Sequence, residues 1–389
     1  MKIKISKLSI FYLAYCSFII YQVLSRSMYT EVIPYRWIMI FKYASVLFCV
    51  AKIALLGKTF KKKEIIVDVI FIFIALLIVA AGYDSRYLIT FLLISAAKDI
   101  DFDKTIRYGL ITLAICLAFV FVGTIMGIIP NLMWIHTGTD KVAYGLGFTY
   151  YSFGATYVFS VLCMWLYLRR EKYTLLELVM AFLIEYYVYN ITTSRLYFYG
   201  IILLEVLCVL YKYSIITFQN KVWNIITYAL FPFLQVLSFV MAILYGRNSQ
   251  LAYMLNVLFS GRLKYMYYGY ANYGMHLLPQ YINMNGASNS VLQNEYFYID
   301  SGYMYSALCF GLLCTIVINI MYIFLFKRSW EMKDKFMYIW LIVISIMCLS
   351  NNFIISIILN PITLLIPSIV KEWDKNGDYV KQRKISYEQ

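Results

Sequence analysis

Histidine, acidic side chains and paired cysteines are all scarce in this chain of 389 residues. Its two histidines, His136 and His276, have no partner at metal-ligand spacing. The eight cysteines fall within apolar runs and form no C-x-x-C pair, so they predict neither a zinc site nor a disulfide framework. We therefore expect no metal centre and no cofactor. The first apolar run lacks a small-residue cleavage site, which predicts a retained helix and not a removed signal peptide.

Apolar residues dominate the rest of the sequence. They make up 62% of the chain and the mean hydropathy is +0.72, beyond what a soluble fold buries around one core. In a bilayer, apolar stretches of roughly 17 to 25 residues must be helices, because helices satisfy their own backbone. We expect one all-α polytopic membrane domain over 1–389 with about twelve transmembrane helices. They are predicted near 8–25, 37–56, 65–81, 86–97, 108–129, 148–168, 174–191, 196–213, 222–244, 301–326, 336–350 and 352–370.

Basic residues occupy alternate gaps between these runs. With a cytoplasmic N-terminus, 24 of the 34 Lys and Arg residues fall in inner segments and eight in outer ones, as the positive-inside rule requires. Both termini are then expected in the cytoplasm, in a bacterial plasma membrane. Anchoring residues and anionic lipid account for the net charge of +14, so we expect contact with membrane lipid and no nucleic-acid binding.

Two outer connections are expected, a smaller loop at 130–147 and a large loop at 246–300. The large loop is too rich in aromatic residues for disorder, and its stretch 251–259 predicts a helix lying in the interface plane. Tyrosine rings stack on sugars and asparagine amides bond their hydroxyls, which favours glycan contact. A plain aromatic belt at the membrane surface is an equally good interpretation of these tyrosines.

Two outer arginines follow small hydroxyl residues. Arg195 follows Thr193 and Ser194 at a mouth between two helices, and Arg262 follows Ser260 and a glycine in the large loop. A guanidinium presents a fork of donors that matches phosphate oxygens, so both are candidates for binding a diphosphate. The alternative is that each arginine reaches to lipid headgroups.

Carboxylates are few outside the inner loops. Asp300 closes the large loop shortly before Tyr303, and it is either a general base or the N-cap of the helix that follows. Glu185 and Glu205 lie within predicted helices, where a charge is expensive unless it is paired or functional.

The order of these motifs resembles that of a known family. The T-T-S-R run at 192–195 is similar to a T-x-S-R motif at an outer mouth, and S-G-R at 260–262 to a motif of a large outer loop. The residues at 300–303 and 309–313 are similar to a closing D/H-N-x-Y and G-[IL]-[IL] pattern. On these motifs and its architecture, the chain resembles the Wzy-type polysaccharide polymerases of bacterial capsule and O-antigen pathways, which are related to the O-antigen ligases. The ligases carry a histidine where this chain has Asp300.

The resemblance implies a metal-independent glycosyltransferase of C-type architecture that makes an exopolysaccharide from undecaprenyl-diphosphate-linked repeat units on the outer face of the membrane. Arg195 and Arg262 would stabilise the diphosphate leaving group, and Asp300 would orient or deprotonate the acceptor hydroxyl. The implied partners are the lipid-linked glycan donor and acceptor, with a flippase and a chain-length regulator of the same pathway. The residues expected to contact the substrate are Thr193, Ser194, Ser260, Tyr303, Tyr150 and Tyr265.

A lipid-linked oligosaccharide flippase, or another polytopic transporter, is the main alternative function. A flippase would also have about twelve spans, but with two similar halves and short outer loops. A membrane O-acyltransferase would need a histidine within a helix, and an ion-coupled transporter would use acidic residues such as Glu185 and Glu205. The long loop at 246–300 favours the polymerase.

Overall fold

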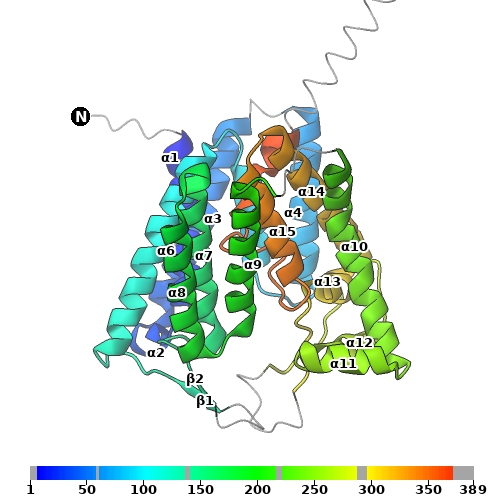
Figure 1. Cartoon of the computed structure of the whole chain (residues 1–389). Helices are drawn as coiled ribbons and strands as arrows, with labels where there is room; N and C mark the ends of the chain where they lie inside the picture. The colour runs from blue at the N-terminus through cyan, green and yellow to red at the C-terminus, as the bar shows by residue number, and fades with distance from the viewer. Residues whose placement is uncertain (1–6, 58–60, 136–140, 216–220, 287–295, 371–389) are drawn as a thin grey trace, which may run out of the picture.

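The computed structural model of the chain describes residues 7–57, 61–135, 141–215, 221–286 and 296–370. Its long helices run side by side between two ends of the molecule (Figure 1). The start of α1, in blue, and the C-terminal helix, in red, both lie at the end drawn at the top. We call the other end, at which α1 finishes and α3 begins, the lower end.

In the first half of the chain, α1 packs against both α3 and α6, and α4 packs against α5. The helices of this half are α1 (Lys7–Leu24), α2 (Tyr29–Val32), α3 (Tyr35–Leu56), α4 (Lys62–Ala80), α5 (Arg86–Ala96) and α6 (Phe102–Ile125). With 11 residues, α5 is about 16 Å long and too short to cross a bilayer core of about 30 Å. All its residues from Ile89 onward are buried, so the predicted segment 86–97 is a short helix enclosed by its neighbours.

The second half begins after a small hairpin in which β1 (Met133–Ile135) pairs antiparallel with β2 (Val142–Tyr144). In this half α10 packs against α14, and α9 against α15. Its helices are α7 (Tyr151–Arg169), α8 (Leu175–Thr192), α9 (Arg195–Lys212), α10 (Lys221–Gly246), α11 (Gln250–Leu258), α12 (Arg262–Tyr273), α13 (Gly302–Tyr305), α14 (Gly311–Glu331) and α15 (Lys335–Met347). The helix predicted at 251–259 is thus present as α11, and Figure 1 shows it lying across the lower end.

Seven helices in the described part of the chain are long and apolar enough to cross a membrane. They are Lys7–Leu24, Tyr35–Leu56, Phe102–Ile125, Tyr151–Arg169, Leu175–Thr192, Trp223–Gly246 and Gly302–Glu331. The helices predicted from 8–25 to 222–244 are all found, with shifted ends. The largest shift is at α6, which begins six residues early because the Asp101 side chain accepts a hydrogen bond from the Lys104 N–H at 3.1 Å.

Apolar side chains cover the outside of the helices as well as the core. Leu47 on α3 is 66% exposed, Ile115 on α6 is 64% exposed and Tyr187 on α8 is 68% exposed. Such a surface is unfavourable in water and favourable against lipid chains. Together with the seven candidate spans, it gives the architecture of a helical protein embedded in a membrane.

The predicted helix 301–326 is interrupted. A turn of π-helix at Ser306–Phe310 follows α13, and α14 begins at Gly311, whose φ of +79° breaks the regular helix. The N–H groups of Leu312 and Leu313 donate to the carbonyls of His276 and Leu277 at 2.9 and 3.1 Å. The irregular segment after α12 therefore satisfies backbone groups that the break leaves unpaired.

The continuous helix predicted at 352–370 is wrong. Residues 351–360 form turns and bends, and only 361–370 are helical. Asn360 precedes Pro361 and has an extended φ of −130°, because the proline ring excludes the helical conformation of the residue before it. The irregular backbone is largely buried, and the Tyr322 hydroxyl donates to the Ile354 carbonyl at 2.6 Å.

Candidate functional site

A tight turn joins α11 to α12 at the lower end. Ser260 and Gly261 both adopt left-handed backbone conformations there, with φ of +54° and +84°. The Asn256 side chain of α11 accepts a hydrogen bond from the Lys264 N–H at 3.1 Å and so satisfies a free donor in the first turn of α12. The turn makes Arg262 the first residue of α12.

Arg262 forms an ion pair with Asp300. The distance from Nε of Arg262 to Oδ2 of Asp300 is 3.3 Å, and the two side chains are 29% and 24% exposed. The alternative role of Asp300 as a helix cap is wrong, because the Ser301 hydroxyl accepts the Met304 N–H at the start of α13. Burial raises the pKa of Asp300, and the Arg262 guanidinium opposes that rise.

Tyrosines surround this ion pair. The rings of Tyr265 on α12 and Tyr296 are 5.0 Å apart. Burial raises the pKa of the Tyr150 phenol, at the start of α7, and the neighbouring phenols and the charge of Asp300 raise it further. Burial also raises the pKa of Tyr296, and Asp300 again adds to the rise. A carboxylate, a guanidinium and three phenols therefore share one site, although they come from three separate parts of the chain.

The turn between α8 and α9 places Arg195 at the same lower end (Figure 1). Thr193 ends α8 with a φ of +55°, and Arg195 is the first residue of α9. The Ser194 hydroxyl between them is buried and has no hydrogen-bond partner in the described structure. Arg195 is exposed, and within the described ranges no hydrogen bond or ion pair joins it to Arg262 or to any other side chain. The structure thus brings Arg262 and Asp300 together but leaves Arg195 without contact to either.

Two predicted substrate contacts have opposite environments. Ser260 is exposed beside Arg262. Tyr303 has no exposed surface, its hydroxyl donates to the Ser345 carbonyl at 2.8 Å and its ring lies 4.8 Å from Phe231. The prediction for Tyr303 is wrong, because this turn of α13 faces the protein core and no substrate can reach the ring.

Arg26 is a part of the lower end that the sequence reasoning missed. It was counted only among the outer basic residues. Its guanidinium carbon lies 4.9 Å from the centre of the Phe153 ring. The signal was present, because Arg26 stands between Ser25 and Ser27 at the end of an apolar helix. An arginine that follows a small hydroxyl residue, which we call the hydroxyl-arginine pattern, is the feature that made Arg195 a candidate.

Two asparagines were missed as well. Asn351 and Asn352 were interpreted only as a gap between two helices. The Asn351 amide donates to the Tyr197 hydroxyl of α9 at 3.0 Å, and Asn352 lies near Tyr87 of α5. The irregular segment 351–360 therefore connects helices from both halves beside the site.

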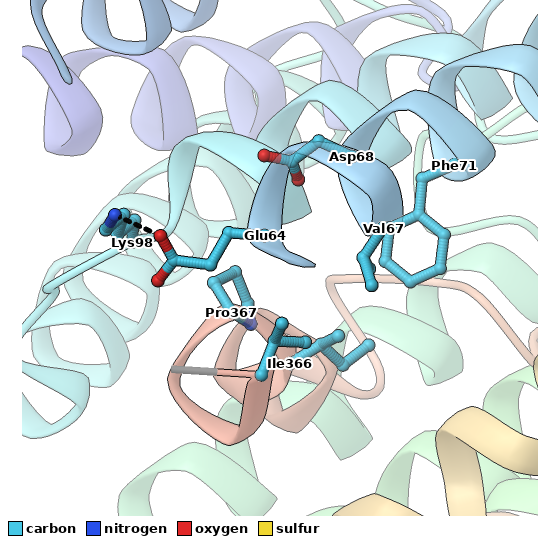
Figure 2. Close-up of a pocket in the computed structure, with 8 residues that line it drawn as sticks. Glu64, Val67, Asp68, Phe71, Lys98, Ile366 and Pro367 are labelled. Carbon is cyan, nitrogen blue, oxygen red and sulfur yellow. Dashed lines mark hydrogen bonds and ion pairs between the residues drawn. The ribbon is translucent and has the colours of Figure 1, made fainter. Parts of the chain in front are cut away.

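A small pocket lies at the opposite end of the helices, under the C-terminal helix (Figure 2). Glu64 and Asp68 of α4 line it with Lys98, Ile366 and Pro367. The Lys98 ammonium lies 2.5 Å from a Glu64 carboxylate oxygen, and the two side chains are 4% and 5% exposed. Lys98 and Glu64 neutralise each other, and the pocket lies at the other end of the helices, so it does not extend the site around Asp300.

Comparison with protein-family models, with curated proteins and with solved structures finds no match for this chain.

Among the residues that the structure describes, no group of three or more His, Cys, Asp and Glu could hold a metal ion. The His276 ring is hydrogen-bonded to the Tyr273 carbonyl, and His136 lies outside the described residues. In the described part of the chain, the site around Asp300 offers arginine, carboxylate and phenol groups. Such groups bind anions and orient hydroxyls.

Proposed function

We propose that this chain is a polysaccharide repeat-unit polymerase of the Wzy type. It joins undecaprenyl-diphosphate-linked oligosaccharides at its lower end, on the outer face of a bacterial plasma membrane. Both termini are cytoplasmic, and the chain makes about twelve passages, of which some are short or broken helices. The observation that carries the proposal is the ion pair between Arg262 and Asp300, which lies among tyrosines.

The arginines stand where helix stability alone does not favour them. Arg195 and Arg262 each occupy the first position of a helix, where the macrodipole repels a cation. An anionic ligand reverses that penalty, because free N–H groups and a guanidinium then face the same negative charge. In the polymerase this ligand is the diphosphate of the lipid-linked donor.

The reaction follows from these roles. The acceptor sugar hydroxyl attacks the anomeric carbon of the donor, a new glycosidic bond forms, and the bond to the diphosphate oxygen breaks. Asp300 receives or orients the hydroxyl proton, while Arg262 and Arg195 balance the charge that develops on the leaving diphosphate. The raised pKa of Asp300 makes it a better proton acceptor than a free aspartate. Tyr150 and Tyr265 provide ring faces for the sugars.

A transporter is the second candidate, and one observation favours it. Glu185 of α8 is completely buried, and neither of its carboxylate oxygens has a hydrogen-bond partner in the described structure. An acidic residue of this kind inside a membrane is often part of an ion or proton pathway. The polymerase remains our conclusion because it accounts for the arginine, carboxylate and phenol groups gathered at the lower end, which a proton pathway through Glu185 would not use.

The test is the surface polymer made by cells in which Arg262→Ala replaces the native chain. We expect single repeat units in place of long chains on a gel, at equal protein level. Arg247→Ala is the matched control, since Arg247 is an exposed arginine on the same connecting segment, and it should leave chain length unchanged. Long chains in the Arg262→Ala strain would contradict the polymerase.

The location of the unpolymerised units separates the two candidates. Loss of a polymerase leaves lipid-linked units on the outer face, where a sugar-oxidising reagent that cannot cross the membrane reaches them in intact cells. Loss of a flippase leaves them inside and protected. Protected units in the Arg262→Ala strain would favour the transporter.

A further inference from the structure

The charges at the lower end are already partly balanced within the protein. Arg262 is paired with Asp300 at 3.3 Å, and Arg86 is paired with Asp84 at 2.8 Å. A diphosphate carries more than one negative charge, and a guanidinium that is neutralised by a carboxylate attracts it less strongly. A diphosphate site therefore requires a cation that the protein does not itself neutralise.

Arg26 is such a cation. In the described part of the chain its guanidinium has no carboxylate partner and no hydrogen-bond acceptor, although the side chain is half-buried. It lies over the face of Phe153 at 4.9 Å. Stacking of this kind holds the plane of the guanidinium while its N–H groups, which point outward from the edge, stay free to bind oxygen atoms.

The backbone of Arg26 is held firmly by the segment that leads into α7. Its carbonyl accepts hydrogen bonds from the N–H and the hydroxyl of Thr149, at 2.9 and 3.1 Å. The neighbouring Met28 N–H donates to the Gly147 carbonyl at 2.8 Å. The position of Arg26 is thus fixed by the same turn that carries Tyr150, one of the phenols around Asp300.

Arg26 and Asp300 also lie on either side of a shared set of phenols, since Thr149, which binds the Arg26 carbonyl, is adjacent to Tyr150. Burial raises the pKa of Tyr298, and this phenol responds to the charges of both Asp300 and Arg26. Tyr197, which accepts the hydrogen bond from Asn351, lies within electrostatic reach of Arg26 as well. Arg26 and Asp300 therefore act on one phenol, Tyr298.

We infer that Arg26 binds the diphosphate of the lipid-linked substrate, together with Arg262. This inference rests on the proposed function and adds a residue from the end of the first helix to a site otherwise built from the second half of the chain. Arg26 acts as a substrate-binding residue whose fork of donors engages phosphate oxygens. Arg195 is the most exposed of these three arginines.

The first experiment measures binding of undecaprenyl diphosphate to the purified full chain in lipid nanodiscs. Loss of one charge-assisted contact in Arg26→Ala should weaken binding about tenfold or more. Arg26→Lys, which keeps the charge and loses the fork, should lie between Arg26→Ala and the unsubstituted chain. Arg36→Ala is the matched control, because Arg36 is an exposed arginine at the same end, and its affinity should stay within about twofold of the unsubstituted chain.

A second experiment needs no variant and covers the case in which Arg26→Ala does not fold. Phenylglyoxal modifies exposed arginines, and mass spectrometry reports the rate at each one. Undecaprenyl diphosphate should slow modification of Arg26 and leave Arg36 unaffected. Equal slowing by nanodiscs of anionic phospholipid, with no further effect of the diphosphate, would assign Arg26 to a lipid headgroup and overturn the inference.

The outcomes separate this inference from the proposed function. If the unsubstituted chain does not bind the diphosphate at all, the proposed function fails and the inference fails with it. If the chain binds the diphosphate, but Arg26→Ala binds equally well and Arg26 is not protected, the inference is wrong and the proposed function is unaffected. Weaker binding by Arg26→Ala with protection of Arg26 supports both.

Discussion

Replacement of Asp300 by asparagine separates a catalytic role of the carboxylate from a merely structural one. Asparagine keeps the size of the side chain and removes its charge. At 3.3 Å from Arg262, the attraction between the two charges is about 1 kcal/mol in water and about 5 kcal/mol at an effective dielectric constant of 20. If Asp300 serves only to hold Arg262, Asp300→Asn frees a guanidinium for the diphosphate, and the polymer should be made normally.

The proposed mechanism predicts the opposite result. Loss of a general base slows turnover by about a hundredfold to ten-thousandfold, which corresponds to about 3 to 5 kcal/mol of activation free energy. Arg262→Ala should slow turnover by about a hundredfold to a thousandfold, which is the effect of removing one hydrogen-bond donor to a developing negative charge. Because the two groups act on the same bond rearrangement, the double variant should be about as slow as the slower single variant.

The assay is polymerisation of lipid-linked repeat units by the purified chain in nanodiscs, followed on a gel, with thermal unfolding of each variant as the control for folding. Turnover should fall as the pH drops through the pKa of Asp300, since only the carboxylate accepts a proton. Arg262 opposes the rise of that pKa, so in Arg262→Gln the fall should begin at a higher pH than in the unsubstituted chain. Near-normal turnover in Asp300→Asn would refute the role of Asp300.

Three further predictions concern other parts of the molecule. Arg195→Ala should shorten the polymer without changing the unfolding temperature, because Arg195 is exposed and packs against little; normal chain length would remove it from the mechanism. Gly311→Ala should destabilise the fold by about 1 to 3 kcal/mol, since the added Cβ would lie 2.6 Å from a backbone carbonyl, whereas Gly127→Ala, with a similar φ and open space, should cost less in the same thermal unfolding. Lys98→Met should lower the free energy of unfolding by about 3 to 5 kcal/mol, because it leaves the Glu64 carboxylate buried and unpaired, and the double variant with Glu64→Met should lose much less. Equal losses in the single and double variants would contradict the burial of that ion pair.

Much of the helical framework was predictable from the sequence, because helix formation in this chain depends on local apolar length. The helices up to 222–244 were found with shifted ends, and the α11 helix was predicted from nine residues. The failures lie where tertiary contacts replace local hydrogen bonds. The break at Gly311 is possible only because a distant segment supplies carbonyls to Leu312 and Leu313, and no local pattern reports that.

The site was only partly predictable, for a related reason. A small hydroxyl residue shortly before an arginine selected Arg262, and Asp300 was predicted at the end of the same connecting segment. The ion pair between them was not predicted. The same pattern was not applied to Arg26, which lies more than 200 residues before Arg262 in the sequence. Tyr303 was predicted to contact the substrate, but it is buried. The residues next to it in the sequence do not show on which side of the short helix α13 its ring lies.

The hydrogen bonds between the segment after α12 and the start of α14 restrict how far this connection can move. The carbonyls of His276 and Leu277 are committed to two amides that would otherwise be unpaired beside hydrocarbon, at several kcal/mol for each group. This part of the connection cannot swing away as a hinged lid without that penalty. It therefore behaves as a fixed wall of this part of the molecule. Under the proposed function, such a wall would guide the polymer and would not open to release it.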